Sequence, residues 1–277
     1  MHVVFREAQG LEETDVPMDL GQSPADLVVL SFSDSDLGAF SEGWKKEKEG
    51  LPSLRLANLV ALKHPLSVDT YIEQTLEKAK GILIRLIGGV QYWEYGLNQV
   101  YNLAQEKGIA LAVLPADGRE DDRLDEFSTI PKSTLLRLKN LTDTGGSKAA
   151  AAALAQLAIS AGLYAAPIIG DKALPDVGYW LPKDGVVSEF SSHNKYQLIC
   201  ITFYRSFLAS EDMAAIRQLS AAFDFLGYQV VGIFAPTLKN PEYGSWIQQA
   251  ITTLQPVAII NATSFSSKGS DGSSPLD

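Results

Sequence analysis

The sequence predicts an α/β protein with two Rossmann-like or flavodoxin-like parallel-sheet domains, of which the second is apparently incomplete. Two observations support this fold class. Short continuous apolar runs alternate with segments of helical periodicity, which is typical of βαβ units with both sheet faces covered. The alternation occurs twice, with a less regular stretch between. We therefore expect an N-terminal α/β domain at 1–165, a connection at 166–195, a partial second α/β domain at 196–265 and a flexible tail at 266–277.

The first domain shows the alternation most clearly. Val68, Tyr71 and Leu76 fall on one face of an expected helix for which Ser67 is a plausible N-cap, and Gly108 is expected to end the next helix. The acidic stretch 118–128 is expected to be an exposed connection. In order, we expect a strand at 26–32, a helix at 67–80, a strand at 81–89, a helix at 95–108, a strand at 109–117 and an alanine-rich helix at 142–162.

The second domain repeats the pattern over a shorter length. We expect a strand at 196–206, a helix at 211–227, a strand at 228–237, a helix at 241–255 and a strand at 256–265. One further strand is expected at 177–182, inside the connection. Three parallel strands are few for a sheet that needs cover on both faces. We therefore expect either that the chain is the N-terminal part of a longer protein or that a partner completes this sheet.

Composition narrows the classes of function. The 277 residues carry a formal net charge of -10 and have a pI of about 4.8, which argues against non-specific binding to nucleic acid or anionic membrane. The single cysteine, Cys200, lies in an apolar run, so we expect a buried small hydrophobe and no intrachain disulfide. No signal peptide and no membrane span are apparent, so we expect a cytoplasmic protein.

The common catalytic motifs are missing. "TGGSK" at 144–148 has serine before lysine, the reverse of a phosphate loop, so we expect a helix start after a glycine turn. His2, His64 and His193 show no metal-ligand spacing, and neither HExxH nor GxSxG occurs. We expect no zinc enzyme, no hydrolase and no metal site in these residues, and we expect His64 to make a loop or cap contact.

The ends of the predicted strands are the candidate ligand sites, because open parallel sheets bind ligands beyond the carboxyl ends of their strands. Arg85 lies inside the apolar run "ILIRLI" and is costly to bury unpaired. Two interpretations remain open: a structural ion pair with Asp or Glu, or a fork that receives a ligand carboxylate. The aromatic residues that follow either stack on a ligand or fill a domain interface. The aromatic, basic and amide residues at strand ends are Tyr92, Trp93, Tyr95, Tyr204, Arg205 and Asn261.

Several of these segments resemble one protein family. "RLANLVALKHPLSVD", "RLIGGVQYWEYG", "ITFYR" and "NATSF" are similar to the N-terminal region of the cobaltochelatase large subunit. The family also includes the porphyrin-binding large subunit of magnesium chelatase. The resemblance covers nearly the whole chain. Family members are several times longer than this chain, which agrees with the incomplete second domain.

The resemblance implies an activity. It implies part of a metal chelatase, a ligase that forms nitrogen–metal bonds, inserting cobalt into hydrogenobyrinic acid a,c-diamide in aerobic cobalamin biosynthesis. ATP is expected to be used by separate AAA+ type subunits, and no cofactor is expected on this segment, with cobalt or alternatively magnesium as substrate. The fragment alone is expected to be inactive. The alternative is a non-catalytic docking or gating module of a magnesium or cobalt chelatase complex.

The family chemistry gives the strand ends an expected role. A corrin or porphyrin is a broad apolar plane with carboxylate or amide side groups. Aromatic rings are expected to stack on the plane, guanidinium groups to pair with the carboxylates, and a side-chain amide to hydrogen-bond to the amide groups of the ring. The substrate-binding residues expected on this basis are Arg85, Tyr92, Trp93, Tyr95, Tyr204, Arg205 and Asn261. No catalytic residue of the family is matched to a position here.

Overall fold

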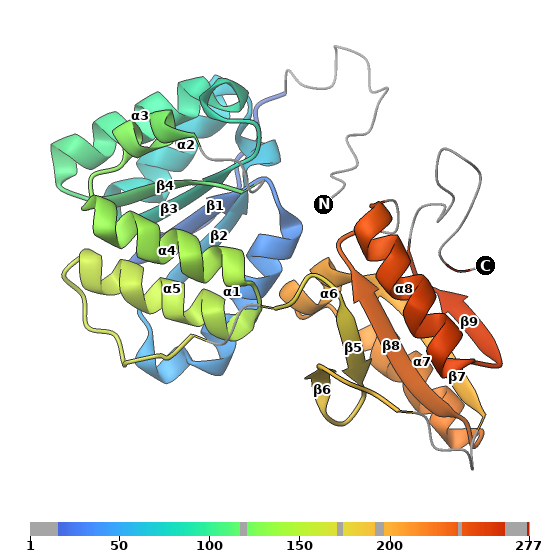
Figure 1. Cartoon of the computed structure of the whole chain (residues 1–277). Coiled ribbons are helices and arrows are strands. Elements are labelled where there is room, and N and C mark those ends of the chain that lie inside the picture. The colour runs from blue at the N-terminus through green and yellow to red at the C-terminus, as the bar shows by residue number, and fades with distance from the viewer. Residues whose placement is uncertain are drawn as a thin grey trace. The chain divides into compact units, whose positions relative to one another are not determined.

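The chain divides into two compact α/β units in a computed structural model (Figure 1). The first unit is His2–Ala173, and the second comprises Leu174–Asp277 together with Met1. The predicted α/β fold class is confirmed, and each unit is described by itself. The structure describes residues 16–116, 121–170, 174–191, 197–237, 240–263 and 276.

The first unit is built on a parallel four-stranded sheet in the order β2-β1-β3-β4. The strands are β1 (Leu27–Ser31), β2 (Leu54–Asn58), β3 (Gly81–Leu86) and β4 (Ala110–Pro115). β1 and β3 are the central strands, and every residue in both is buried. Such continuous apolar strands form because helices cover both faces of the sheet.

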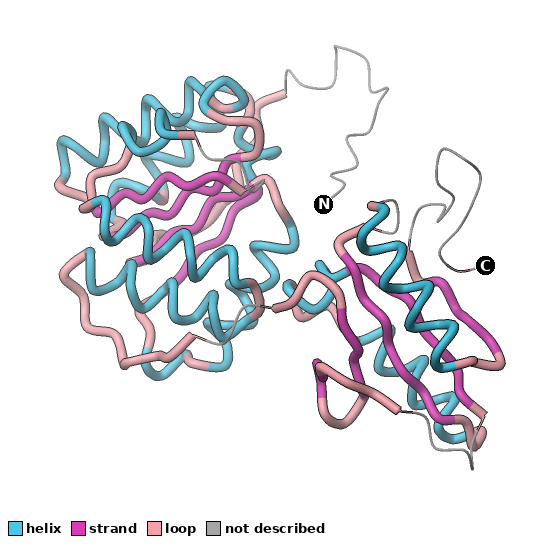
Figure 2. Tube along the Cα trace, in the orientation of Figure 1, coloured by secondary structure: helices cyan, strands magenta, loops and turns pink. Residues whose placement is uncertain are grey.

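Helices cover both faces of this sheet, as the tube in Figure 2 shows. α2 (Pro65–Gln74) and α3 (Glu94–Lys107) pack on one face, and α1 (Asp34–Lys46), α4 (Lys132–Thr144) and α5 (Ser147–Ser160) on the other. α1 and α5 approach closely at Gly43, because a Cβ there would collide with the carbonyl oxygen of Ser147 and lie 2.9 Å from the nitrogen of Ala151. Short 3-10 helices are Lys48–Gly50, Leu59–Leu62, Leu76–Lys78, Val90–Tyr92 and Asp122–Phe127.

The second unit has a mixed five-stranded sheet in the order β6-β5-β8-β7-β9. Its strands are β5 (Gly178–Leu181), β6 (Gly185–Val187), β7 (Leu198–Tyr204), β8 (Gln229–Ala235) and β9 (Ala258–Asn261). β7, β8 and β9 are parallel, whereas β5 is antiparallel to both of its neighbours. Its helices are α6 (Arg205–Ala209), α7 (Ala214–Phe225) and α8 (Pro241–Leu254); α7 packs on one face and α8 on the other.

Some sequence expectations need correction. No helix was expected directly after the first strand, but α1 begins there, because the hydroxyl of Ser33 accepts a hydrogen bond from the Asp36 amide and caps the helix. The N-cap of α2 is His64 rather than Ser67, since the Nδ1 atom of His64 accepts from the Leu66 amide. The expected connection, 166–195, contains β5 and β6, which extend the second sheet. Apart from residue 276, the expected tail lies outside the described residues.

Candidate functional site

Each unit has a topological switch point at the carboxyl end of its sheet. In the first unit the chain passes from β1 to β2 on one side and then crosses to β3 on the other. In the second unit it passes from β7 to β8 and then crosses to β9. Open α/β sheets bind ligands outside the strand ends at such a point. The switch points therefore lie between β1 and β3 and between β7 and β9.

A buried polar cluster occupies the switch point of the first unit. Arg85 is the partner of Ser31 in the pairing of β3 with β1, and its Nε lies 3.1 Å from Oδ2 of Asp36 in α1. A second carboxylate, Asp143 at the end of α4, lies 3.8 Å from the Nη2 atom of Arg85. We call Ser31, Asp36, Arg85 and Asp143 the switch-point cluster. It joins the two central strands to two of the helices on one face.

Two of the three charged side chains in the switch-point cluster are largely removed from water. The side chain of Arg85 is 5% exposed and that of Asp36 is 19% exposed, whereas that of Asp143 is 39% exposed. Burial raises the pKa of Asp36 above its ordinary value, while Arg85 and the hydroxyl of Ser31, which donates to Oδ2 at 3.0 Å, oppose that rise. The Nε of Arg85 makes no hydrogen bond of good geometry in the described part of the chain. Arg85 is therefore ion-paired with Asp36, while its Nε–H group makes no hydrogen bond of good geometry to the described residues.

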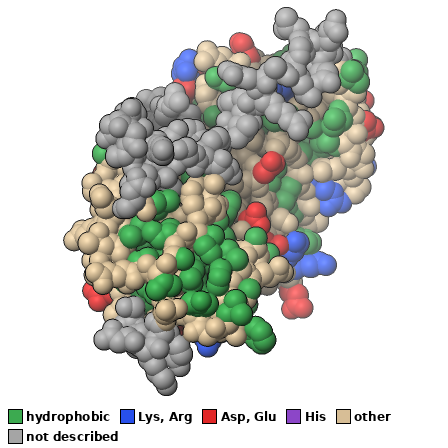
Figure 3. Space-filling view, turned by 90° about the vertical axis from the view of Figure 1, so that its right-hand side faces the viewer, with side chains coloured by type: hydrophobic (Ala, Val, Ile, Leu, Met, Phe, Trp, Pro, Cys, Tyr) green, Lys and Arg blue, Asp and Glu red, His purple; other side chains and the backbone are tan. Residues whose placement is uncertain are grey.

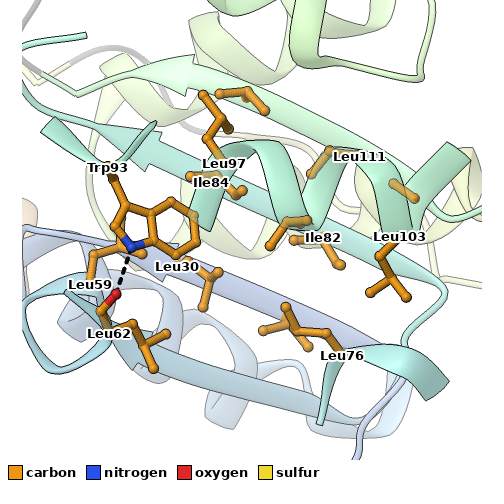
Figure 4. Close-up of a cluster of buried hydrophobic side chains, with 14 of the residues drawn as sticks. Leu30, Leu59, Leu62, Leu76, Ile82, Ile84, Trp93, Leu97, Leu103 and Leu111 are labelled. Carbon is orange, nitrogen blue, oxygen red and sulfur yellow. Dashed lines mark hydrogen bonds between the residues drawn. The ribbon is translucent and has the colours of Figure 1, made fainter. Parts of the chain in front are cut away.

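Trp93 lies in the core and not at a ligand surface. Its side chain is 5% exposed, and its Nε1 donates to the carbonyl oxygen of Leu62 at 2.7 Å (Figure 4). The indole packs in the cluster between the sheet and helices α2 and α3, whereas Arg85 points to the opposite face, towards α1 and α4. The buried Trp93 ring offers little surface to a ligand, and its assignment as a substrate-binding residue stays a prediction.

Tyr92 and Tyr95 are the accessible aromatic side chains after β3. They are 52% and 42% exposed. The ring of Tyr92 covers Gly88, where an added Cβ would collide with it, and the hydroxyl of Tyr95 donates to Asp69 at 2.8 Å. Gly88 and Gly89 both have positive φ, at 80° and 83°, which explains the glycine pair that ends this strand.

The predicted residues of the second unit are held by their own unit. Arg205 donates through Nε to the carbonyl oxygen of Pro175 at 3.0 Å and through Nη2 to that of Leu174 at 2.7 Å. The Oδ1 atom of Asn261, at the end of β9, accepts from the hydroxyl groups of Thr202 at 2.9 Å and Thr263 at 2.8 Å. Arg205 thus anchors the start of the unit, and Asn261 joins the ends of β7 and β9.

Tyr204 is the last residue of β7 and lies at the switch point of the second unit. Its ring contacts Phe207 edge to face, with centroids 6.3 Å apart and an interplanar angle of 83°. Tyr204 is partly exposed, so part of its ring remains accessible. The predicted substrate-binding residues thus fall into two groups, one in each unit.

A shallow cavity lies elsewhere in the second unit. Its volume is 420 Å³, within the range of small-molecule sites. The rings of Tyr179 and Trp246 on its wall contact each other, with centroids 5.2 Å apart. The sequence did not single out this cavity, because its walls come from β5, the segment after β6, and α8. The lining residues are Tyr179, Ser188, Glu189, Phe190, Trp246, Gln249, Ala250 and Thr253.

The carboxylates of the switch-point cluster were missed from the sequence. Asp36 follows the first strand within "SDSD". Its position was a usable signal, since residues just after parallel strands meet at one edge of a sheet. Asp143 lies near the end of α4, a helix that the sequence did not predict. Among the described residues, no His, Cys, Asp or Glu side chains form a group of three or more that could hold a metal ion. No helix in the described ranges is long and apolar enough to cross a membrane.

Comparisons with known proteins point to one family. No protein-family model matches the chain. It is 32% identical over 98% of its length to the aerobic cobaltochelatase subunit CobN of Sinorhizobium sp, and 29% identical over 96% to that of Pseudomonas aeruginosa. The chain spans 22% of the length of each of these relatives.

A solved structure supports the fold. The catalytic subunit of cobaltochelatase from Mycobacterium tuberculosis matches with a TM-score of 0.63 over 85% of this chain and 18% of its own, at 18% identity. At that identity the match shows a shared fold. The similarity to the two CobN sequences covers nearly every residue and agrees with the segments that carried the resemblance in the sequence. The resemblance seen in the sequence is therefore confirmed. Over almost its whole length, this chain is related to the large subunit of aerobic cobaltochelatase, and it corresponds to the N-terminal region of that subunit.

Proposed function

We propose that this chain acts as the N-terminal part of the tetrapyrrole-binding large subunit of an ATP-dependent cobalt chelatase. The observation that carries the proposal is the match to CobN along 98% of the chain. Cobalt would be a substrate of the complex, inserted into hydrogenobyrinic acid a,c-diamide on the aerobic route to cobalamin. ATP would be used by AAA+ type partner subunits.

Within that complex, the accessible part of the candidate site is aromatic. Tyr92 and Tyr95 offer exposed rings on which the plane of a corrin would stack. Arg85 is the buried cation that is nearest in sequence to these tyrosines. A carboxylate of the ring would replace Asp143, which is the more distant of the two carboxylate partners of Arg85. In this form of the proposal the segment holds and orients the ring, and the metal-insertion chemistry belongs to other parts of the subunit.

A docking or gating role is the second candidate, and specific contacts favour it. Arg205 and Asn261 make hydrogen bonds within their own unit, and the ring of Trp93 is covered. Residues engaged in this way stabilise the fold and leave few groups for a ligand. The segment would then bind other subunits of a cobalt or magnesium chelatase, or cover the ring site, without contacting the ring through these side chains.

Titration of the purified chain with hydrogenobyrinic acid a,c-diamide separates the two roles. Tryptophan fluorescence is the readout, and the wild type is compared with Tyr92→Ala and, as a control, with Lys45→Ala at an exposed ion pair. Saturable quenching at about micromolar ring that weakens in Tyr92→Ala supports ring binding. No quenching together with binding of the ATPase subunits supports docking. A chain that binds neither contradicts the proposed function.

A further inference from the structure

The two units share a topology, so the first unit shows what the second one lacks. In each, the first parallel strand is central, the next lies on one side, and the third lies on the other side after a crossover. α1 and α7 make the first crossover, and α2 and α8 the second. β3 and β9 therefore hold the same position. In the first unit β3 pairs with β4 on its second edge, whereas in the described residues β9 pairs only with β7.

The exposure of β9 differs from that of its counterpart. All six residues of β3 are buried. In β9, Ala258 and Asn261 are exposed, and Ile259 and Ile260 are partly exposed, although the strand is apolar. Both strands are largely apolar, so the difference follows from what lies beside them. β3 is covered by β4, α3 and α5, and β9 has no described equivalent of any of these.

Further apolar side chains are exposed at the amino end of the same sheet. Val257, just before β9, is 56% exposed, and Phe225 and Leu226 at the end of α7 are 91% and 65% exposed. In the first unit the same end of the sheet is covered by α5, where a Cβ on Gly81 would lie 3.1 Å from Leu157 and 3.4 Å from Ala161. Figure 3 looks onto the side of the molecule on which β9 lies and shows hydrophobic side chains gathered in one area.

We propose that the free edge of β9 is a docking site for a helix–strand segment whose strand pairs with β9 in parallel, as β4 pairs with β3. The segment is supplied by large-subunit polypeptide outside these 277 residues, so the proposal rests on the proposed function. The length of the relatives favours this occupant, since the chain matches only 22% of each. The order of α3 and β4 predicts a helix before the strand, packed beside α8 over Ile259.

One backbone amide reports on this edge directly. The Val257 amide donates to the carbonyl oxygen of Leu198 in β7 at 2.8 Å. Successive amides of a strand point to opposite sides, so the Ala258 amide points to the free edge. Proline at 258 would remove that donor and keep the bond from Val257, and serine at 258 would keep both. Ala258→Pro and Ala258→Ser are therefore a matched pair.

Hydrogen exchange tests the proposal in two proteins. One is this chain, and the other is a chimera in which the chain replaces the matched region of Sinorhizobium CobN. We expect the Ala258 amide to exchange at least about a hundredfold more slowly in the chimera. Amides of β6, the opposite edge strand, serve as the internal control and should exchange equally in both proteins. Equal exchange of Ala258 in the two proteins overturns the proposal.

Other occupants give different results. Protection of Ala258 in the 277-residue chain that rises with protein concentration, together with a dimer in light scattering, assigns the edge to a second copy and overturns the proposal. Protection that appears in the chimera only after the ATPase subunits are added assigns it to a partner and also overturns it. Slow exchange in a chimera that inserts no cobalt leaves the docking site standing and counts against the proposed function alone.

A binding measurement serves as a second readout that does not depend on the chimera. The rest of Sinorhizobium CobN, produced separately, is added to the immobilised chain. We expect the wild type and Ala258→Ser to bind it and Ala258→Pro to bind at least about tenfold more weakly, which is about 1.4 kcal/mol. Equal binding of all three proteins contradicts pairing at β9.

Discussion

Arg85 is the residue whose surroundings explain most about the first unit. It carries a charge into a strand in which every residue is buried, and it is accommodated because Asp36 lies 3.1 Å from its Nε. The need for a carboxylate partner was predictable, since an unpaired buried guanidinium costs several kcal/mol. Its identity was not, because Asp36 and Asp143 are distant in sequence and only the fold brings them to the end of β3.

Arg85→Ala should destabilise the first unit strongly. Removing one member of a buried ion pair leaves the other charge buried without its partner, which costs about 3 kcal/mol or more. Urea unfolding followed by circular dichroism gives the change in the free energy of unfolding. Lys45→Ala, at the exposed Lys45–Glu42 pair, is the control and should cost about 0.5 kcal/mol or less. Equal effects of the two substitutions would show that Arg85 contributes no more than a surface charge.

Asp36 should make stability depend on pH in a defined direction. Its pKa in the folded chain is raised above 3.8, chiefly by burial, so the folded state binds the proton more tightly than the unfolded state. Stability relative to Asp36→Asn should therefore rise as the pH falls from neutrality through the raised pKa, and level off below 3.8. Urea unfolding of both proteins at a series of pH values measures this. Parallel curves would contradict a raised pKa.

Cys200 should behave as a buried core residue. It is fully buried in β7, as predicted from its apolar run, and burial raises the pKa of its thiol to about 12. In folded protein at pH 8 we expect no labelling by a thiol reagent such as DTNB over minutes, and stoichiometric labelling in denaturant. Rapid labelling without denaturant would mean that β7 is accessible.

At the scale of elements, segments with a clear apolar pattern were predictable and segments without one were not. The strand at 26–32 and the helix at 241–255 match β1 and α8 closely, because a continuous apolar run identifies the strand and helical periodicity identifies the helix. α1 buries only Ala39, Phe40 and Gly43, so its apolar stripe is narrow. β2 was missed because it is a five-residue edge strand that contains Arg55. The secondary structure of such segments depends on tertiary packing.

Gly43→Ala should destabilise the packing of α1 on α5. Alanine favours an isolated helix over glycine by about 1 kcal/mol, so propensity alone predicts a gain. The added Cβ would collide with the carbonyl oxygen of Ser147, which belongs to the backbone and cannot rotate away. We expect a net loss of about 1–3 kcal/mol in thermal or urea unfolding, against a change within about 0.5 kcal/mol for the exposed neighbour Glu42→Ala. A stabilised Gly43→Ala would contradict the close approach of α1 and α5.

Some features of the candidate site were predictable from the sequence and others were not. The ends of the strands and Arg85 were found from the sequence because they break local patterns. The separation of Arg85 from Trp93 was not foreseeable, since it depends on the alternation of side chains along β3 and on the cover of α3. Residues that are close in sequence can thus lie on opposite faces of one sheet.

At the scale of the whole molecule, two units of shared topology are joined in one chain, and in the described residues of the second unit β9 pairs only with β7. The match to CobN covers both units, and the likeness to a cobaltochelatase structure shows a shared fold. The resemblance to the cobaltochelatase large subunit followed from four short segments of sequence. Their combination, and not any one of them, carried the information.

Cobalt insertion by the chimera is the decisive measurement for the proposed function. The chimera, in which this chain replaces the matched region of Sinorhizobium CobN, is mixed with the remaining chelatase subunits, ATP, cobalt and hydrogenobyrinic acid a,c-diamide, and insertion is followed by absorbance. We expect insertion at a rate within about tenfold of parental CobN, a difference of about 1.4 kcal/mol or less in the activation free energy. A folded chimera that assembles with its partners and inserts no cobalt would contradict the proposed function.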